Sequence, residues 1–166
     1  MINYIEKGLY LHKFIAESKY KLWEEDGVFK SDNDIEVQKI IDSFDPLPAA
    51  KIKAFDLIKE ASAKQRLNYV TQAAGKDAEY TFKATEAAQY SINQSVGVFM
   101  QARANATGES PATIAAEWNY RSMAWQSIGA AIAAIEDKSA QDINAEKSWQ
   151  NCDIIAQAAI KQLEAI

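Results

Sequence analysis

The side chains that most often perform catalysis are scarce in this sequence. His12 is the only histidine and Cys152 the only cysteine, so a Ser–His or Cys–His catalytic pair would have to use His12. No serine or cysteine stands in a motif around it. We interpret His12 as a surface or half-buried side chain and Cys152 as a small buried hydrophobe. The sequence therefore predicts no catalytic residue and a protein that is not an enzyme.

Acidic residues form two short groups that could hold a metal ion or act as acid–base pairs. Asp32 and Asp34 flank Asn33, but the glycine and the terminal glutamate that a calcium loop requires are missing at the right spacing. Helix capping explains this group better, and a charged hairpin turn explains the acidic run at residues 24–26. Without a Cys/His cluster or a glycine-rich phosphate loop, we expect no metal, no cofactor and no small-molecule substrate.

Two tryptophans one heptad apart are the most unusual local feature. Trp118 and Trp125 enclose Arg121. Aromatic and guanidinium groups dominate the energetics of protein interfaces, so these three residues are candidates for binding a partner. The alternative is core packing, with the arginine extended to the edge and paired with Glu86 or Glu117. If the tryptophans are core, alanine at either position should cost about 3–5 kcal/mol of stability.

These residues belong to a long helix that we expect from Ser110 to Ile135. Ser110 and Pro111 are typical of an N-cap and a first helical residue. Bulky side chains then follow at spacings of four and three, which places them on one helix face: Ile114, Trp118, Arg121, Trp125, Ile128, Ile132 and Ile135. Alanines fill most of the positions between them, so the helix can accept partners on two sides.

Residues 1–48 predict a small α+β head. A short helix is expected over residues 9–17, and Asp26-Gly27 between two β-prone runs predicts a hairpin. A run of capping residues precedes a second helix, which ends before Pro46 because the residue before a proline is pushed out of the helical region.

The hairpin carries the second set of candidate partner-binding residues, which are Trp23, Val28 and Phe29. Two strands alone are marginally stable in water, so the hairpin should lie against a helix or another chain. We expect it to bind by strand addition or by insertion of an aromatic ring.

Residues 49–166 predict a helical body, either a bundle of long helices or a coiled-coil-like arrangement. One helix is expected over residues 49–74 with Gly75 at its end, and the next, capped by Asp77, should end near Gly108. The last apolar set is one residue out of step with the stripe of the 110–135 helix. We favour a break near residue 139 over one long helix that changes its buried face.

Composition supports a mainly α fold. The 166 residues include only 6 Gly and 3 Pro, and alanine supplies much of the 48% hydrophobic content. The net charge of −5, without a basic run, excludes the electrostatic signature of nucleic-acid binding. No secretory signal or apolar stretch of membrane-spanning length occurs, so we expect synthesis in the cytosol and no membrane partner.

Three stretches occur in the order found in small tail-associated proteins of tailed phages and prophages. Residues 8–48 (GLYLHKFIAESKYKLWEEDGVFKSDNDIEVQKIIDSFDPLP) resemble their opening of helix, "DGV" hairpin and "FDPL" helix stop. Residues 74–90 (AGKDAEYTFKATEAAQY) are similar to their "Y–K–EA–Y" helix. Residues 106–136 (ATGESPATIAAEWNYRSMAWQSIGAAIAAIE) are similar to their "TG–IA–W–IGAAIEA" helix. The segment that contains Trp149 and Cys152 extends beyond this pattern.

The resemblance implies a tail-fibre assembly chaperone or a minor tail structural component that acts through protein–protein contacts. It implies a phage tail or tail-fibre protein as partner, self-association, and a location in the host cytoplasm during assembly or in the virion tail. The alternative is a phage-encoded inhibitor of a host defence system that binds by occlusion. One exposed acidic face would favour it, built from Glu24, Glu25, Asp26, Asp32 and Asp34.

Overall fold

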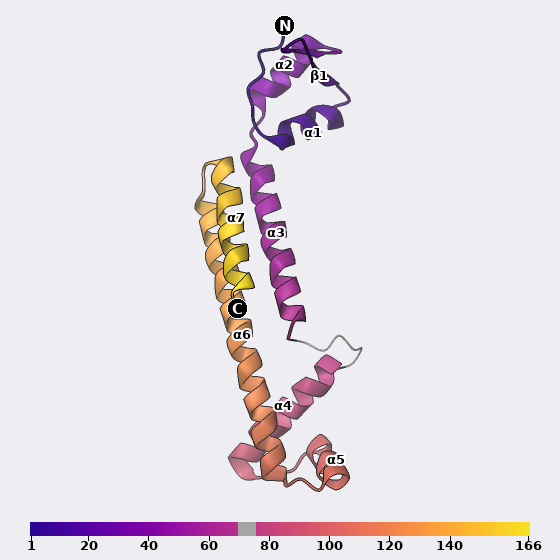
Figure 1. Cartoon of the computed structure of the whole chain (residues 1–166), viewed down its shortest axis with the longest axis vertical. Coiled ribbons are helices and arrows are strands. Elements are labelled where there is room, and N and C mark those ends of the chain that lie inside the picture. The colour runs from indigo at the N-terminus through magenta and orange to yellow at the C-terminus, as the bar shows by residue number, and fades with distance from the viewer. Residues whose placement is uncertain (70–75) are drawn as a thin grey trace. The chain divides into compact units, whose positions relative to one another are not determined.

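The structure is a computed structural model that describes residues 1–69 and 76–166, with Leu9 described by its backbone alone. The described residues form a mainly α fold with one two-stranded antiparallel hairpin near the N-terminus, as the sequence predicts (Figure 1). Contacts group the chain into two units. The first joins residues 1–59 to 138–160, and the second joins residues 60–137 to 161–166. The division of the chain at residue 48 stays a prediction.

The head, residues 1–48, contains α1 (Leu9–Glu17), β1 (Leu22–Glu25), β2 (Val28–Ser31) and α2 (Asp34–Ser43) in this order. Asp26 and Gly27 both have positive φ angles, 54° and 74°, which is the type I′ turn that matches the twist of a hairpin. The Asn33 side chain caps α2 by accepting a hydrogen bond from the Glu36 N–H at 3.2 Å. The expected helix, hairpin and capped second helix are confirmed.

The core of the head lies between the two helices and one face of the hairpin. Its fully packed members come from the N-terminal segment, α1 and α2: Ile2, Leu11, Ile15, Val37 and Ile41. Leu22 and Phe29 pack against this cluster from the hairpin. The hairpin therefore has a covered inner face and an outer face that the head leaves open.

Three further helices supply the rest of the first unit: the first part of α3 (Leu47–Leu67), the end of α6 (Pro111–Ala145) and most of α7 (Trp149–Glu164) (Figure 1). Small buried residues line their contacts, which lets the helices approach closely: Ala50, Ala54, Ser139, Cys152, Ala156 and Ala159. The Lys51 Nζ atom also donates to the Asn144 carbonyl of α6 at 2.8 Å.

The predicted helix break near Ser139 is wrong. α6 continues to Ala145, and Ser139 is buried at 6% exposure because its side chain is small enough to continue the packed face between Ile132 and Ile143. The chain turns at residues 146–148 instead. There the Glu146 carboxylate accepts the Lys147 and Ser148 N–H groups at 2.7 and 2.8 Å and so stabilises the turn that precedes α7.

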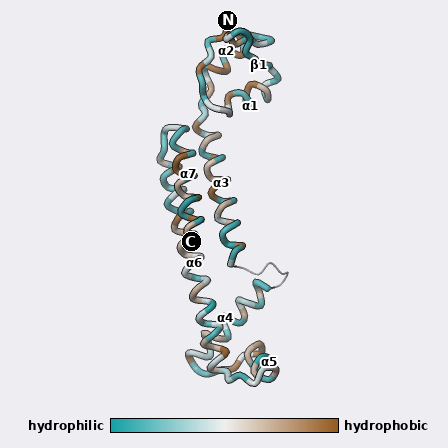
Figure 2. The backbone as a smooth tube through the Cα atoms, in the orientation of Figure 1, coloured by the Kyte–Doolittle hydropathy of each residue, from teal (hydrophilic) through white to brown (hydrophobic). Residues whose placement is uncertain are grey.

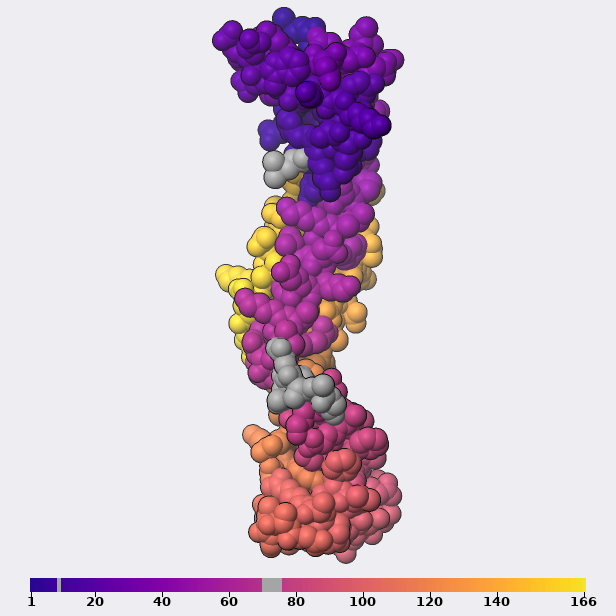
Figure 3. All heavy atoms as spheres, turned by 90° about the vertical axis from the view of Figure 1, so that its right-hand side faces the viewer, coloured from indigo at the N-terminus to yellow at the C-terminus, as the bar shows by residue number. Residues whose placement is uncertain are grey.

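The second unit contains α4 (Lys76–Asn93), α5 (Val98–Thr107) and most of α6, and Figure 3 shows their atoms packed against one another. Its core combines residues from all three helices: Ala87, Met100, Ile114, Ala115 and Trp118. Gly108 ends α5 with a φ of 76°, and the Ser110 Oγ accepts the Thr113 N–H at 3.2 Å ahead of Pro111. Both expected end signals are confirmed.

Two predicted helix ends in this part of the chain need correction. α3 ends at Leu67 rather than near Ala74, and Asn68 and Tyr69 form a turn with hydrogen bonds of the i→i+3 type. The expected end at Gly75 lies outside the described residues.

The single helix expected between Asp77 and Gly108 is two helices. The chain leaves the helical region at Gln94, whose φ is 59°, and α5 starts after Gly97. Both oxygens of the Glu86 carboxylate accept N–H groups at the start of α5, from Phe99 at 3.0 Å and from Met100 at 2.8 Å. A Cβ atom at residue 97 would lie 2.1 Å from the Glu86 side chain, so the glycine makes room for this cap.

Replacement of Glu86 by alanine should lower the free energy of unfolding by about 1–2 kcal/mol, because two N–H groups of α5 lose their acceptor. Glu86→Gln keeps one acceptor oxygen and should lose less. Urea unfolding followed by circular dichroism measures both values. Amide exchange at Phe99 and Met100 should accelerate in the alanine variant, and unchanged exchange there would argue against the cap.

Candidate functional site

The outer face of the hairpin carries two of the three predicted binding residues. The strands pair Trp23 with Lys30 and Glu25 with Val28, and these four side chains share one face because strand residues alternate. Trp23 is 43% exposed, and the Lys30 Nζ atom lies 2.6 Å from the Glu25 carboxylate. This face is open and presents an aromatic ring beside an ion pair.

Phe29 does not lie on that face. It belongs to the opposite face of β2, where its ring stacks on Tyr4 with centroids 4.1 Å apart and an interplanar angle of 18°. Its position against the head core makes it a packing residue in the isolated chain. The structure thus brings Trp23 and Val28 together and separates them from Phe29.

The two tryptophans that lie one heptad apart also differ, since one is buried in a core and the other is exposed. Trp118 is 5% exposed and lies in the core of the second unit, with the Lys83 Nζ atom 5.5 Å and the Arg103 Cζ atom 6.0 Å from its ring centroids. Trp125 is 37% exposed. Arg121 has a side chain that is 71% exposed and pairs with Glu117 at 2.6 Å, one of its two predicted partners.

A network of ion pairs surrounds Trp118. The Arg103 guanidinium contacts Glu109 at 2.9 Å and Glu117 at 2.5 Å, and its hydrogen bonds lower the pKa of both carboxyl groups. Nearby, hydrogen bonds from Lys76 and Lys83 lower the pKa of Glu79 to about 2. These pairs satisfy charged groups around a buried ring, and their geometry favours a structural role.

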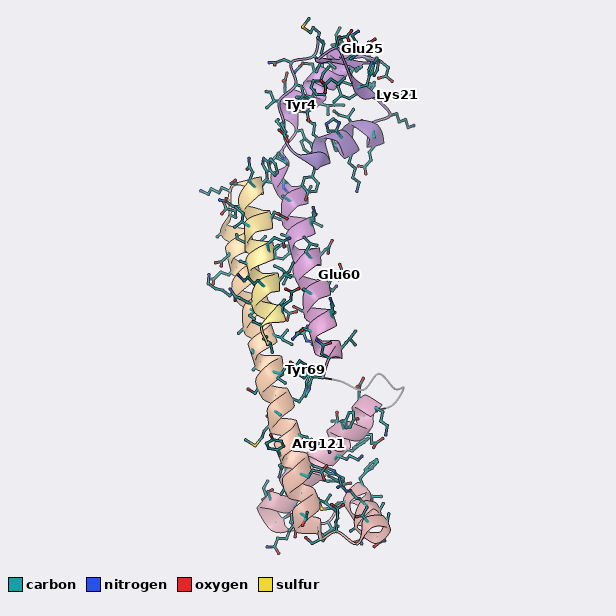
Figure 4. All side chains as sticks on the ribbon, viewed as in Figure 1. Tyr4, Lys21, Glu25, Glu60, Tyr69 and Arg121 are labelled. Carbon is teal, nitrogen blue, oxygen red and sulfur yellow. The ribbon has the colours of Figure 1, made fainter. Side chains whose placement is uncertain are left out.

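The middle of α6 is a long helical stretch without a buried residue. From Asn119 to Ala131 no residue of α6 is buried, although Trp118 and Ile132 on either side are. Tyr120 is 76% exposed and Met123 is 68% exposed; at a spacing of three residues they share one side of the helix. Figure 4 labels Arg121 in this stretch. We call residues 119–131 the open segment of α6.

Tyr120 and Met123 were not among the predicted binding residues. The heavy stripe of α6 contains Trp118 and Trp125, whereas Tyr120 and Met123 lie on another side of the helix. A signal for them does exist in the sequence. Two large side chains three residues apart on an otherwise alanine-rich face would be unusual if that face were always exposed to water.

The residues with catalytic potential have ordinary surroundings. His12 is exposed, and its Nε2 atom lies 2.9 Å from the Tyr4 hydroxyl. Cys152 is fully buried, its Sγ donates to the Ser148 carbonyl at 3.6 Å, and burial raises the pKa of its thiol. Asp32 accepts the Lys21 N–H and Asp34 the Ser31 N–H, and the residue between them, Asn33, is the one that caps α2. No group of three potential metal ligands occurs in the described residues.

No family model, curated protein sequence or solved structure matches this chain. Among residues 1–69 and 76–166 no helix has both the length and the apolar character required to cross a bilayer. In Figure 2 hydrophilic residues occur together with hydrophobic ones along the long helices.

Proposed function

We propose that this chain is a non-enzymatic protein that acts by contact with other protein chains, and that the open segment of α6 is its principal binding surface. The observation that carries the proposal is the absence of any buried residue between Asn119 and Ala131. Most of the stability of a helix in a protein comes from tertiary packing of one of its faces, and this stretch lacks a buried face. A partner surface on the open segment would supply that packing.

The exposed side chains of the open segment are of the types that bind. Tyr120, Met123 and Trp125 are all exposed, and Arg121 lies between them with its side chain 71% exposed. Aromatic residues, methionine and arginine are enriched at protein interfaces, and tyrosine, tryptophan and arginine provide most hot spots. Alanines between them leave room for a partner backbone to approach.

Within this class we propose a phage-tail-associated protein, either a tail-fibre assembly chaperone or a minor tail structural component. The support is the order of the three stretches described above, which fall on the head, on α4, and on the start and open segment of α6. The partner is then a tail or tail-fibre protein, met in the host cytoplasm during assembly or retained in the virion tail.

The alternative of an inhibitor that acts through an acidic face gains no specific support. Lys30 pairs with Glu25, and Asp32 and Asp34 are engaged by backbone N–H groups of the head. The negative charge of this face is therefore interrupted by a lysine, and two of its carboxylates already accept hydrogen bonds within the head. Binding to a host defence effector instead of a tail protein would favour this alternative.

The proposal is tested by co-expression with the tail and tail-fibre chains of the same genome, followed by affinity capture. The double variant Tyr120→Glu/Met123→Glu should weaken the complex by at least about tenfold, because charge enters the centre of the interface. Gln141→Glu, an exposed change on the same helix, is the matched control and should bind normally. Capture that is equal for all variants, or no complex with any tail chain, would contradict the proposal.

A further inference from the structure

We propose that the outer edge of β1 pairs with β1 of a second copy of this chain, so that two hairpins form one four-stranded antiparallel sheet across a two-fold axis. The proposal concerns the head alone and is independent of the open segment of α6. It depends on three features of the hairpin: the direction of its backbone groups, the state of its two edges, and the order of charges along β1.

The tight turn determines which backbone groups of β1 are directed outward. Glu25 and Val28 close a two-residue turn, so they exchange hydrogen bonds, and the alternation of an antiparallel ladder makes Trp23 and Lys30 the next bonded pair. Leu22 and Glu24 therefore direct their N–H and C=O groups away from β2.

The two edges of the hairpin differ. On the β2 edge, the Ser31 N–H donates to the Asp34 carboxylate at 3.1 Å, so the start of α2 occupies that edge. On the β1 edge, no backbone group from elsewhere in residues 1–69 or 76–166 bonds to Leu22 or Glu24. An open strand edge is a template for another strand.

Charge order selects the register and the partner. The segment around β1 reads Lys21-Leu22-Trp23-Glu24-Glu25, basic at one end and acidic at the other. When Leu22 bonds to Glu24 of a second copy, Lys21 faces the second copy's Glu25, twice by symmetry. If the register moved by one bonded pair toward the turn, Glu24 would lie opposite Glu24 of the second copy, and the two like charges would repel each other.

The same register places the two Trp23 rings at the axis. Their position is a non-hydrogen-bonded pair, where Cα atoms approach to about 4.5 Å and side chains are closest. Aromatic pairs at such sites stabilise sheets. This pairing would cover the ring that the single chain leaves 43% exposed.

The ion pairs of the single chain are compatible with this arrangement. Lys21 is exposed and has no carboxylate within ion-pair distance in the described residues, and Figure 4 shows it at the margin of the head. Glu25 already contacts Lys30 across the hairpin at 2.6 Å. Pairing would give Glu25 a second cation on the other side and extend the row of alternating charges.

Sedimentation of the purified chain alone over a concentration series tests the proposal. The wild type should dimerise, Lys21→Glu should weaken dimerisation by about tenfold or more because two attractive pairs become repulsive, and Lys21→Glu/Glu25→Lys should restore it. Lys19→Glu, outside the paired residues, is the control. A monomeric wild type, or a dimer that Lys21→Glu leaves unchanged, would overturn the proposal.

A cross-link provides a second readout that does not depend on affinity. Trp23→Cys should form a disulfide-linked dimer on mild oxidation, since residues paired across the axis lie at disulfide distance. Glu24→Cys should cross-link much less, because its partner is Leu22. The native Cys152 is fully buried and should not interfere. Equal cross-linking at both positions would exclude this register, and both tests are independent of capture by a tail protein.

Discussion

Replacement of Trp118 by alanine is expected to lower the free energy of unfolding of the second unit by about 3–5 kcal/mol. The ring is 5% exposed and packs with Met100 and Ile114 in a core that three helices share. Its loss removes a large apolar surface and leaves a cavity that short helices cannot close easily. The Lys83 and Arg103 cations beside the ring would also lose their aromatic contact.

Trp125→Ala is the matched control, because the residue type and the helix are the same and only the coverage differs. Because Trp125 is 37% exposed, its replacement by alanine should lower the free energy of unfolding by only about 1 kcal/mol. Urea unfolding followed by far-ultraviolet circular dichroism measures both variants. If Trp118→Ala unfolds at the wild-type midpoint while partner binding is lost, Trp118 is an interface residue rather than a core residue.

Local signals in the sequence predict much of this fold. Asp26-Gly27 predicts the hairpin because both positions require a positive φ angle, which the structure shows. Ser110-Pro111 predicts the start of α6, and Gly108 the end of α5. Each of these signals acts within a few residues, so neighbouring side chains and the backbone are sufficient to recognise it.

The errors come from groups that act across longer separations. The break between α4 and α5 depends on Glu86, which reaches N–H groups of Phe99 and Met100 thirteen and fourteen residues later. No window of helical periodicity contains that information. The length of α6 depends on the burial of Ser139. A serine is polar, so the sequence predicts an exposed position, but in the structure its side chain is packed inside.

The candidate site was predictable only in part for a related reason. Trp118 and Trp125 occupy the same stripe, and periodicity shows which face they share without showing how far along the helix that face is covered. The buried contacts of α4 and α5 with α6 end at Trp118, and Asn119 adds hydrogen bonds to Ala87 and Ser91 of α4. Tyr120 and Met123 become prominent for the same reason, since both are largely exposed in a segment that contains no buried residue.

Acidification should destabilise the second unit more than any single surface substitution, because basic partners lower the pKa values of several of its carboxyl groups in the folded chain. Hydrogen bonds from arginine or lysine lower the pKa of Glu79, Glu109, Glu117 and Glu136 in the folded chain. A group whose pKa is lower in the folded state binds fewer protons there than in the unfolded state. Its contribution is complete above the unfolded value of about 4.5 and is lost as the pH falls.

For Glu79 the loss should extend from pH about 4.5 to about 2, and the other three groups should add to it at the upper end of that range. The urea midpoint of the second unit is therefore expected to be constant near neutral pH and to fall steadily in this window. Arg103→Gln should flatten that fall, since Glu109 and Glu117 then lose their shared partner. Lys138→Gln, which removes an exposed pair with Asp142, should leave the slope unchanged. A midpoint that does not move with acid, or a slope that Arg103→Gln does not change, would show that these ion pairs contribute little to the fold that holds the open segment.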